Sequence, residues 1–249
     1  MRNYANPTNF LELVAAILPW LAALTLALLG AGMYMSVVAP ADYQQGFSVK
    51  IMYVHVPAAW LSMFIYSTMV LAALGTMVWR HPRADAAQKA GAPLGAGFTF
   101  ICLATGSIWG HPMWGAWWVW DARLTSVLVL FLISLGLIAL WRTIEDQGAA
   151  ARAAAILTLV GAVNIPIIKF SVDWWNTLHQ PASVFRLGGP TIERSLLWPL
   201  LMMGIAFTFL FLTLHLMAIR NEILARRLRR LSIMAVESET PMAAMEAAR

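Results

Sequence analysis

The residues best suited to chemistry lie in one short stretch, SIWGHPMWGAWWVWDARLTS at 107–126. It holds several of the chain's twelve tryptophans and ends in Asp121 and Arg123. Indole faces suit a flat conjugated ligand, and an arginine suits a carboxylate on its edge. Simpler explanations remain open. Tryptophans form belts at membrane interfaces, Asp121 fits a helix N-cap, and Arg123 fits an interfacial arginine that reaches toward water.

The spacing of the tryptophans favours a binding surface over a simple belt. In a helix, Trp114, Trp117 and Trp118 would share one face, while Trp120 would point elsewhere. Such a segment would expose apolar surface toward both lipid and solvent. Exposed aromatic area of that size usually marks a binding site.

Two histidines far apart in the sequence are candidate metal ligands. His55 begins an apolar segment, and His179 follows the aromatic stretch DWWN. Neutral imidazole is a good iron ligand, so one histidine on each side of a flat ring would give bis-histidine haem. A structural histidine remains the alternative. His111 lies in the tryptophan stretch, and we expect His81 and His215 to be solvated or interfacial.

The composition is that of a membrane protein. The 249 residues are 60% hydrophobic and 12% charged, whereas soluble domains carry about 25% charged residues. The net charge of +5 does not indicate nucleic-acid binding, because the basic residues lie at the ends of apolar runs. A single cysteine, Cys102, excludes an internal disulfide and the C-x-x-C-H haem attachment motif. The N-terminus lacks the pattern of a cleaved signal.

Six apolar segments are long enough, or nearly so, to cross a bilayer as helices. We therefore predict an all-α, polytopic protein, with a six-helix domain at 1–230 and a flexible tail at 231–249. The fifth segment is short and contains Asn164 and Pro166. The predicted spans are 13–38, 51–79, 93–110, 124–141, 153–169 and 195–219.

The basic residues predict the orientation. Most Lys and Arg residues fall at the chain termini and in the joins after the second and fourth spans. The positive-inside rule then places both termini in the cytoplasm. The segments 39–50, 109–124 and 170–194 would lie on the outer face. The basic tail could lie on anionic lipid or meet a cytoplasmic partner.

Four separated stretches resemble a known family. WGAWWVWD at 114–121 fits the W-G-x-x-W-x-W-D signature of the haem-handling membrane proteins of cytochrome c biogenesis. Together with YVHVPAAWLSM at 53–63, WDARLTS at 120–126 and VDWWNTLHQPAS at 172–183, it most resembles the haem exporter protein C family of maturation system I. The similarity covers nearly the whole chain except the two tails.

The resemblance implies a haem-binding site and a set of partners. Haem b would bind noncovalently at the periplasmic face of the bacterial inner membrane, with His55 and His179 as axial ligands. The residues matching the signature, which would support the haem edge, are Trp114, Gly115, Trp118, Trp120 and Asp121. A periplasmic haem chaperone (the E component) would receive the haem. A single-span D component and an ABC transporter pair, A and B, would complete the complex.

Within this hypothesis Arg123 would neutralise one haem propionate, and Arg186 or Arg194 another. The chain itself would be a transport or chaperone component and not an enzyme. It lacks a P-loop motif, so any ATP use would belong to a partner.

Two alternatives remain: a permease for another aromatic or amphipathic solute, and a haem-based membrane oxidoreductase. A zinc site is less well supported, because no Cys or His cluster has short spacing.

Overall fold

A computed structural model describes residues 6–81, 83–175, 177–180 and 183–247, with side chains as far as 235. Its described part is helical and contains no strand beyond an isolated bridge between Asp42 and Gly46. The elements are α1 (Pro7–Val38), η1 (Phe47–Ile51), α2 (Met52–Trp79), α3 (Ala84–Trp114), α4 (Ala122–Thr143), α5 (Gln147–Gly161), α6 (Asn164–Trp174) and α7 (Arg194–Ala247).

The prediction of six membrane-spanning segments is confirmed. Six stretches of helix in the described residues are long and apolar enough to cross a bilayer, and each contains one predicted span. The observed helices run further than the predicted spans. The third span, for example, was predicted as 93–110, but α3 covers Ala84–Trp114. Hydropathy marks the part of a helix that crosses hydrocarbon, whereas the helix itself continues until a cap or a break ends it.

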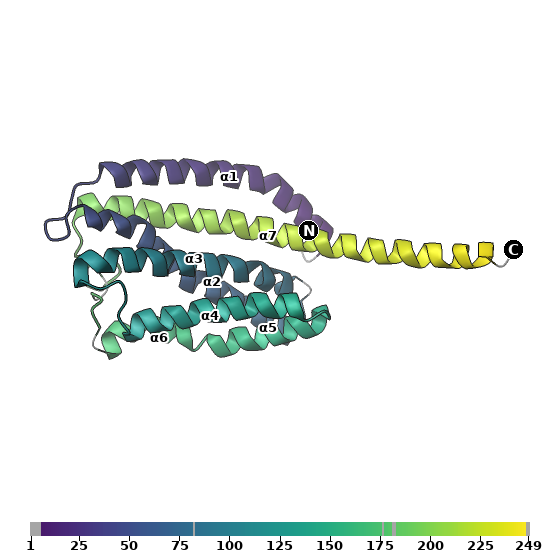
Figure 1. Cartoon of the computed structure of the whole chain (residues 1–249). Helices are drawn as coiled ribbons and strands as arrows, with labels where there is room; N and C mark the ends of the chain where they lie inside the picture. Colours follow the sequence, from purple (N-terminus) through teal and green to yellow (C-terminus); the bar gives the residue numbers. More distant parts are fainter. Residues whose placement is uncertain (1–5, 82, 176, 181–182, 248–249) are drawn as a thin grey trace.

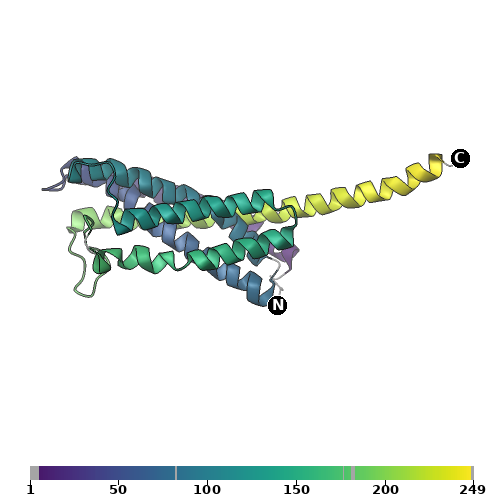
Figure 2. The same ribbon diagram turned by 60° about the horizontal axis from the view of Figure 1, so that its bottom comes forward.

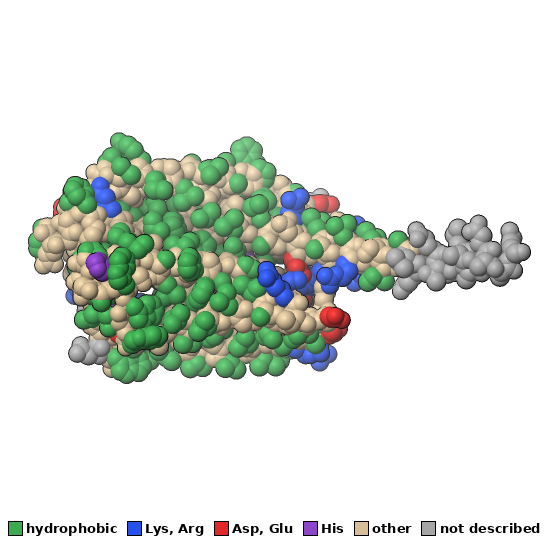
Figure 3. Space-filling view, in the orientation of Figure 1, with side chains coloured by type: hydrophobic (Ala, Val, Ile, Leu, Met, Phe, Trp, Pro, Cys, Tyr) green, Lys and Arg blue, Asp and Glu red, His purple; other side chains and the backbone are tan. Residues whose placement is uncertain are grey.

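The helices form one bundle around the pair α2 and α3 (Figure 1). Helix α4 packs against α3, helix α5 packs against α2 and α4, and α7 packs against both central helices. Helix α1 is outermost and packs mainly on α7, where Thr25 and Thr213 share a 2.8 Å hydrogen bond. Most of its surface is therefore exposed, including Trp20 at 79%. The middle of the molecule is apolar, and basic side chains gather where α7 leaves the bundle (Figure 3).

The fifth span is interrupted within its length. Helix α5 ends at Gly161 and α6 begins at Asn164. Pro166 has no backbone N–H to donate, and its ring disfavours a continuous helix through the preceding turn. The Asn164 side-chain amide donates to the Ser126 carbonyl oxygen at 2.8 Å, so the break is tied to α4. The sequence placed Asn164 and Pro166 within this span but did not predict the break.

The connections divide the bundle into two different ends (Figures 1 and 2). Residues 39–51, 115–121, 177–180 and 183–193 lie at one end, which we call the loop end. At the opposite end, which we call the arm end, α7 continues alone beyond the other helices as far as Ala247. Helix α7 therefore runs through the predicted boundary at 230. The flexibility of 231–249 stays a prediction.

The ring of His215 is not fully solvated, whereas its expected position at the membrane interface stays a prediction. Its ring stacks on Phe211, with 5.1 Å between the ring centroids. Its Nδ1 atom is buried and has no hydrogen-bond partner in the described residues. A single histidine near the end of an apolar run gives no indication of which helix will cover it.

Candidate functional site

A cavity of about 480 Å³ lies at the loop end, between α2, α3, α4, α6 and the segment that follows α6. This volume is in the usual range for sites that enclose a small organic ligand. More than half of the residues in its wall are apolar (aliphatic residues, methionine, aromatic residues and Cys102), so it favours an apolar guest. The apolar wall includes Val56, Ala59, Met63, Leu103, Met113, Val127, Ile168, Val172, Leu178 and Val184.

His55 borders this cavity from the first turn of α2. Its Nδ1 atom lies 3.1 Å from the Cys102 carbonyl oxygen and 3.2 Å from Thr105 Oγ1. A carbonyl oxygen only accepts hydrogen bonds, so Nδ1 must carry the proton. The Nε2 atom then keeps its lone pair and has no partner in the described part of the chain. His55 is therefore held in the tautomer that metal ligation requires.

His179 borders the same cavity from the loop between α6 and α7. Its Nδ1 atom lies 3.1 Å from Asp121 Oδ2. The carboxylate accepts, so Nδ1 donates and Nε2 is again left with a lone pair. Burial lowers the pKa of His179 below its ordinary value, although the hydrogen bond to Asp121 opposes that shift. The neutral imidazole is consequently favoured at neutral pH.

Asp121 has two structural partners and does not border the cavity. Its Oδ1 atom accepts from the Leu124 backbone N–H at 2.7 Å, which makes it the N-cap of α4. The N-cap reading of the sequence is thus confirmed. The same carboxylate holds His179 through Oδ2, and only 6% of its side chain is exposed. Asp121 therefore links the start of α4 to the histidine loop.

The tryptophan segment is not the continuous helix that the face argument assumed. Helix α3 ends at Trp114, where Gly115 adopts a left-handed φ of 72°. Glycine reaches this conformation without a Cβ penalty. The backbone from 116 to 121 is not helical. The turn separates Trp114 from the later tryptophans, so helical spacing does not relate them.

The tryptophans fall into two groups. Trp114 and Trp118 border the cavity. Trp114 meets His179 edge-to-face at 4.9 Å, and the Nε1 atom of Trp118 is buried without a partner in the described residues. Trp120 is 75% exposed and contacts the edge of Trp118 from outside. An unpartnered buried N–H is costly unless a ligand accepts from it.

Arg123 borders the cavity and is anchored at two nitrogens, because its Nη2 atom donates to the Lys169 carbonyl oxygen at 3.5 Å. Its Nε atom donates to Ser171 Oγ at 3.1 Å, so α6 holds the side chain in place. This contact is more specific than that of an arginine that only reaches for water. Arg186 and Arg194 do not border the cavity. Nothing in the structure connects them to a ligand there.

Sequence reasoning missed the residues that support the histidines. A Cβ atom added at Gly106 would lie 2.9 Å from His55 Cε1, so this close approach depends on glycine. Trp109 contacts His55 edge-to-face at 5.6 Å and donates from Nε1 to Gln45 Oε1 at 3.0 Å. Gly106 and Gln45 both border the cavity. No pattern in the sequence distinguishes Gly106 from other helical glycines.

The cavity thus brings together five of the eight predicted site residues: His55, Trp114, Trp118, Arg123 and His179. Gly115, Trp120 and Asp121 do not border it. Among the described residues, no group of three or more His, Cys, Asp or Glu side chains could hold a metal ion by itself. The two histidines would instead suit a metal whose remaining ligands belong to its own macrocycle.

Comparison with known proteins gives a consistent result over nearly the whole chain. The family model described as "Heme exporter protein C" matches residues 1–234. A protein of that name from Bradyrhizobium diazoefficiens is 67% identical over 92% of this chain and 88% of its own length. The Escherichia coli K12 protein of the same name is 48% identical over 92% and 93%. A "putative cytochrome c biosynthesis ccmC-like mitochondrial protein" from Marchantia polymorpha is 46% identical over 77% and 82%.

Proposed function

This chain belongs to the haem exporter protein C family of cytochrome c biogenesis, and from that premise we propose that it binds haem noncovalently in the cavity at the loop end and passes it on. Membership makes it a haem-handling transport component and a multi-pass membrane protein. The finer proposal is that haem b is the cargo and that His55 and His179 ligate its iron.

The observation that carries this proposal is that both histidines have the same tautomer, with the proton on Nδ1 and a free lone pair on Nε2. In each ring Nδ1 donates to a fixed acceptor, the Cys102 carbonyl oxygen in one case and the Asp121 carboxylate in the other. Iron-ligating histidines commonly have such partners, which fix the ring and raise its basicity. Two neutral imidazoles bordering one apolar cavity fit a planar macrocycle with two open axial positions.

The polar groups of the cavity suit the carboxylates on the haem edge. Arg123 offers guanidinium N–H groups that neither Ser171 nor the Lys169 carbonyl oxygen occupies, and Trp118 offers its buried Nε1. An arginine and a carboxylate form charge-assisted hydrogen bonds, which are stronger inside a poorly solvated cavity. We assign one propionate to this pair. The apolar wall would contact the rest of the ring.

The proposed setting is the bacterial inner membrane, with the loop end facing the periplasm. The chain's basic residues support this orientation through the positive-inside rule. We propose that a periplasmic haem chaperone, the E component, takes the haem and forms the covalent bond on its own histidine. The single-span D component and the ABC pair A and B would assemble with the membrane domain. This chain would hold and orient the ring during transfer.

The test is the visible spectrum of the purified protein, oxidised and reduced, in wild type and in His55→Ala and His179→Ala. We expect a low-spin bis-histidine spectrum in wild type and its loss or conversion to high spin in both variants. His111→Ala is the matched control, because that ring stacks on Trp117 and does not border the cavity. It should leave the spectrum unchanged.

A protein that takes up no haem when haemin is added would contradict the proposal, as would a spectrum insensitive to both substitutions. The first result would favour the permease for another aromatic solute. A bound haem that exchanges electrons with quinone and is never transferred to the chaperone would favour the oxidoreductase. Transfer is measured separately, by mixing haem-loaded protein with the purified chaperone and following covalent haem on the latter.

A further inference from the structure

A second hollow of about 360 Å³ lies at the arm end, far along the bundle from the haem cavity. Its floor is the start of α3, one wall is the end of α4, and the other wall is α7. The two walls do not pack closely against each other, so a groove is left over α3. It is bordered by apolar side chains of these three helices and by a small set of polar ones.

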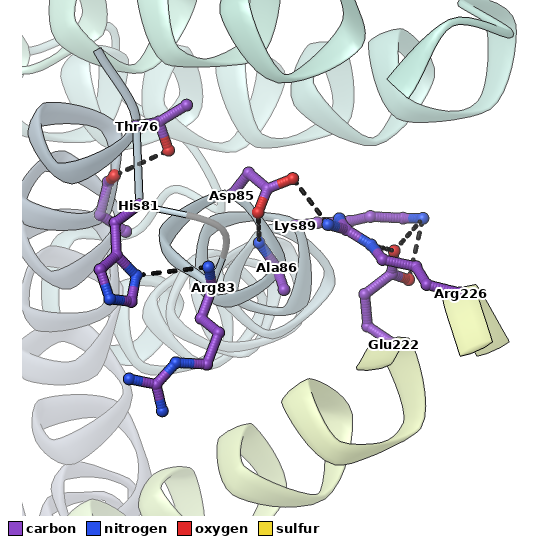
Figure 4. Close-up of polar contacts among 9 residues, drawn as sticks. Thr76, His81, Arg83, Asp85, Ala86, Lys89, Glu222 and Arg226 are labelled. Carbon is purple, nitrogen blue, oxygen red and sulfur yellow. Dashed lines mark hydrogen bonds and ion pairs between the residues drawn. The ribbon is translucent and has the colours of Figure 1, made fainter. Parts of the chain in front are cut away.

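The acidic group at this groove is already neutralised. Glu222 on α7 accepts from Lys89 Nζ, which lies 2.9 Å from both carboxylate oxygens, and from Arg226 Nε at 2.7 Å. Arg226 also binds Asp85 at 2.7 Å. Figure 4 shows Lys89 of α3 and Arg226 of α7 converging on Glu222. These four residues hold α7 against α3 and have no net charge together.

Two donors at the groove have no partner among the residues that the structure describes. Arg142 on α4 makes no hydrogen bond or ion pair with the described residues, although it borders the groove. The Nε1 atom of Trp141 is buried and also lacks a partner there. The Trp141 ring lies beneath Lys89, with 5.5 Å from Nζ to its centroid. The groove therefore has one uncompensated positive charge and one buried N–H donor.

Beyond the groove, toward the middle of the bundle, the exposed surface of α3 and α4 is apolar. Pro93 borders the groove, and one turn deeper a Cβ added at Gly97 would meet no atom within 4 Å. Leu135 on α4 is 42% exposed on the same face as Arg142. The rings of Phe100 and Phe131 meet 6.1 Å apart further along. From Lys89 to Phe100 the helix rises about 16 Å, a length suited to a stretch of hydrocarbon chain.

We propose that this groove is a binding site for one anionic phospholipid. The headgroup phosphate would accept hydrogen bonds from Arg142 and from Trp141 Nε1, and an acyl chain would lie on the exposed apolar surface of α3 and α4 over Gly97. Basic pockets between transmembrane helices bind anionic headgroups through the same combination of charge and N–H donors. The site lies at the other end of the bundle from His55 and His179, and it does not depend on haem binding.

The experiment is native mass spectrometry of the full chain in detergent micelles, titrated with phosphatidylglycerol or with phosphatidylcholine of the same acyl chains. We expect one phosphatidylglycerol to be retained at least fivefold more tightly than phosphatidylcholine. Arg142→Gln and Trp141→Phe should each remove most of that preference, because each deletes one donor. Gly97→Leu should weaken the binding of both lipids, because its side chain would occupy the surface on which the acyl chain lies.

Arg152→Gln is the matched control, since it removes an exposed arginine of α5 that does not border the groove. It should bind lipid as the wild type does. Equal retention of the two lipids, or a preference unchanged in Arg142→Gln and Trp141→Phe, would overturn the proposal. Complete competition by soluble glycerophosphate would show a free phosphate site and would also overturn it. The far-ultraviolet circular dichroism spectrum and the thermal midpoint of each variant serve as checks on folding.

Discussion

Gly106→Ala tests the haem site without changing any proposed ligand. The added Cβ would lie 2.9 Å from His55 Cε1 and 3.4 Å from Nδ1. To regain ordinary contact the ring must move by about 0.5 Å, because overlap of this size is not tolerated in a packed interior. That movement pulls Nδ1 away from the Cys102 carbonyl oxygen and from Thr105. His55 would then lose the alignment that points Nε2 at the iron.

The expected magnitude follows from the cost of overpacking. Inserting a methyl group into a filled site costs about 1–3 kcal/mol. Here that cost disfavours the position of the His55 ring in which Nε2 can bind the iron. At 1.4 kcal/mol for each tenfold, haem affinity should fall about 5- to 150-fold. The assay is haemin titration of the protein in lipid nanodiscs, followed by the Soret band.

Gly97→Ala is the matched control on the same helix, because its new Cβ would meet no atom within 4 Å. It should bind haem as the wild type does and gain about 0.5–1 kcal/mol of helix stability. Unchanged haem affinity in Gly106→Ala, with an unchanged spectrum, would refute the argument that His55 requires a glycine beside it.

Three further predictions concern Asp121, His179 and Trp118. Asp121→Asn keeps an N-cap oxygen for Leu124 but turns an amide N–H toward His179 Nδ1. Haem affinity should therefore fall about 10- to 100-fold in the titration, while thermal stability changes little. Burial lowers the pKa of His179 below 6.5, so this residue stabilises the haem-free fold above pH 6.5 and that contribution is lost as the pH falls toward the lowered pKa. The thermal midpoint should therefore drop between pH 7.5 and 5.5 by less in His179→Ala than in wild type; an equal drop would contradict the assignment. Trp118→Phe removes the buried Nε1 donor and keeps an aromatic ring, so haem should bind several-fold more weakly. The difference between the two proteins should be smaller for haem dimethyl ester, because its neutral ester carbonyl oxygens accept weaker hydrogen bonds than carboxylates do.

The sequence predicted the spans because a bilayer imposes a length and a polarity on every crossing segment. It did not predict where the helices end, since those ends depend on local caps and turns. Gly115 ends α3 with a left-handed turn, whereas the run from Trp114 to Trp120 was considered as a helix. Aromatic residues are compatible with either backbone, so composition alone does not decide between them.

The site was predictable in its residue types but not in its supporting contacts. His55 and His179 are far apart in the sequence but were expected on the same outer face. In the structure both lie at the loop end, where they border one cavity. The partners of their Nδ1 atoms come from α3 and from the start of α4. Such contacts depend on how the helices pack against each other. A single sequence carries no signal for which carbonyl or carboxylate will lie beside a given ring.

The unbroken length of α7 connects the two ends of the bundle through one continuous helix. It begins just after the loop that carries His179 and extends for 54 residues, about 80 Å of continuous helix. The ion pairs at Glu222 and Arg226 attach it to α3 about 40 Å from its first residue. A tilt of about 5° there would displace Arg194 by about 4 Å. If α7 tilts as one rigid helix, a force on its protruding end would therefore move its first residues, and with them the loop that carries His179.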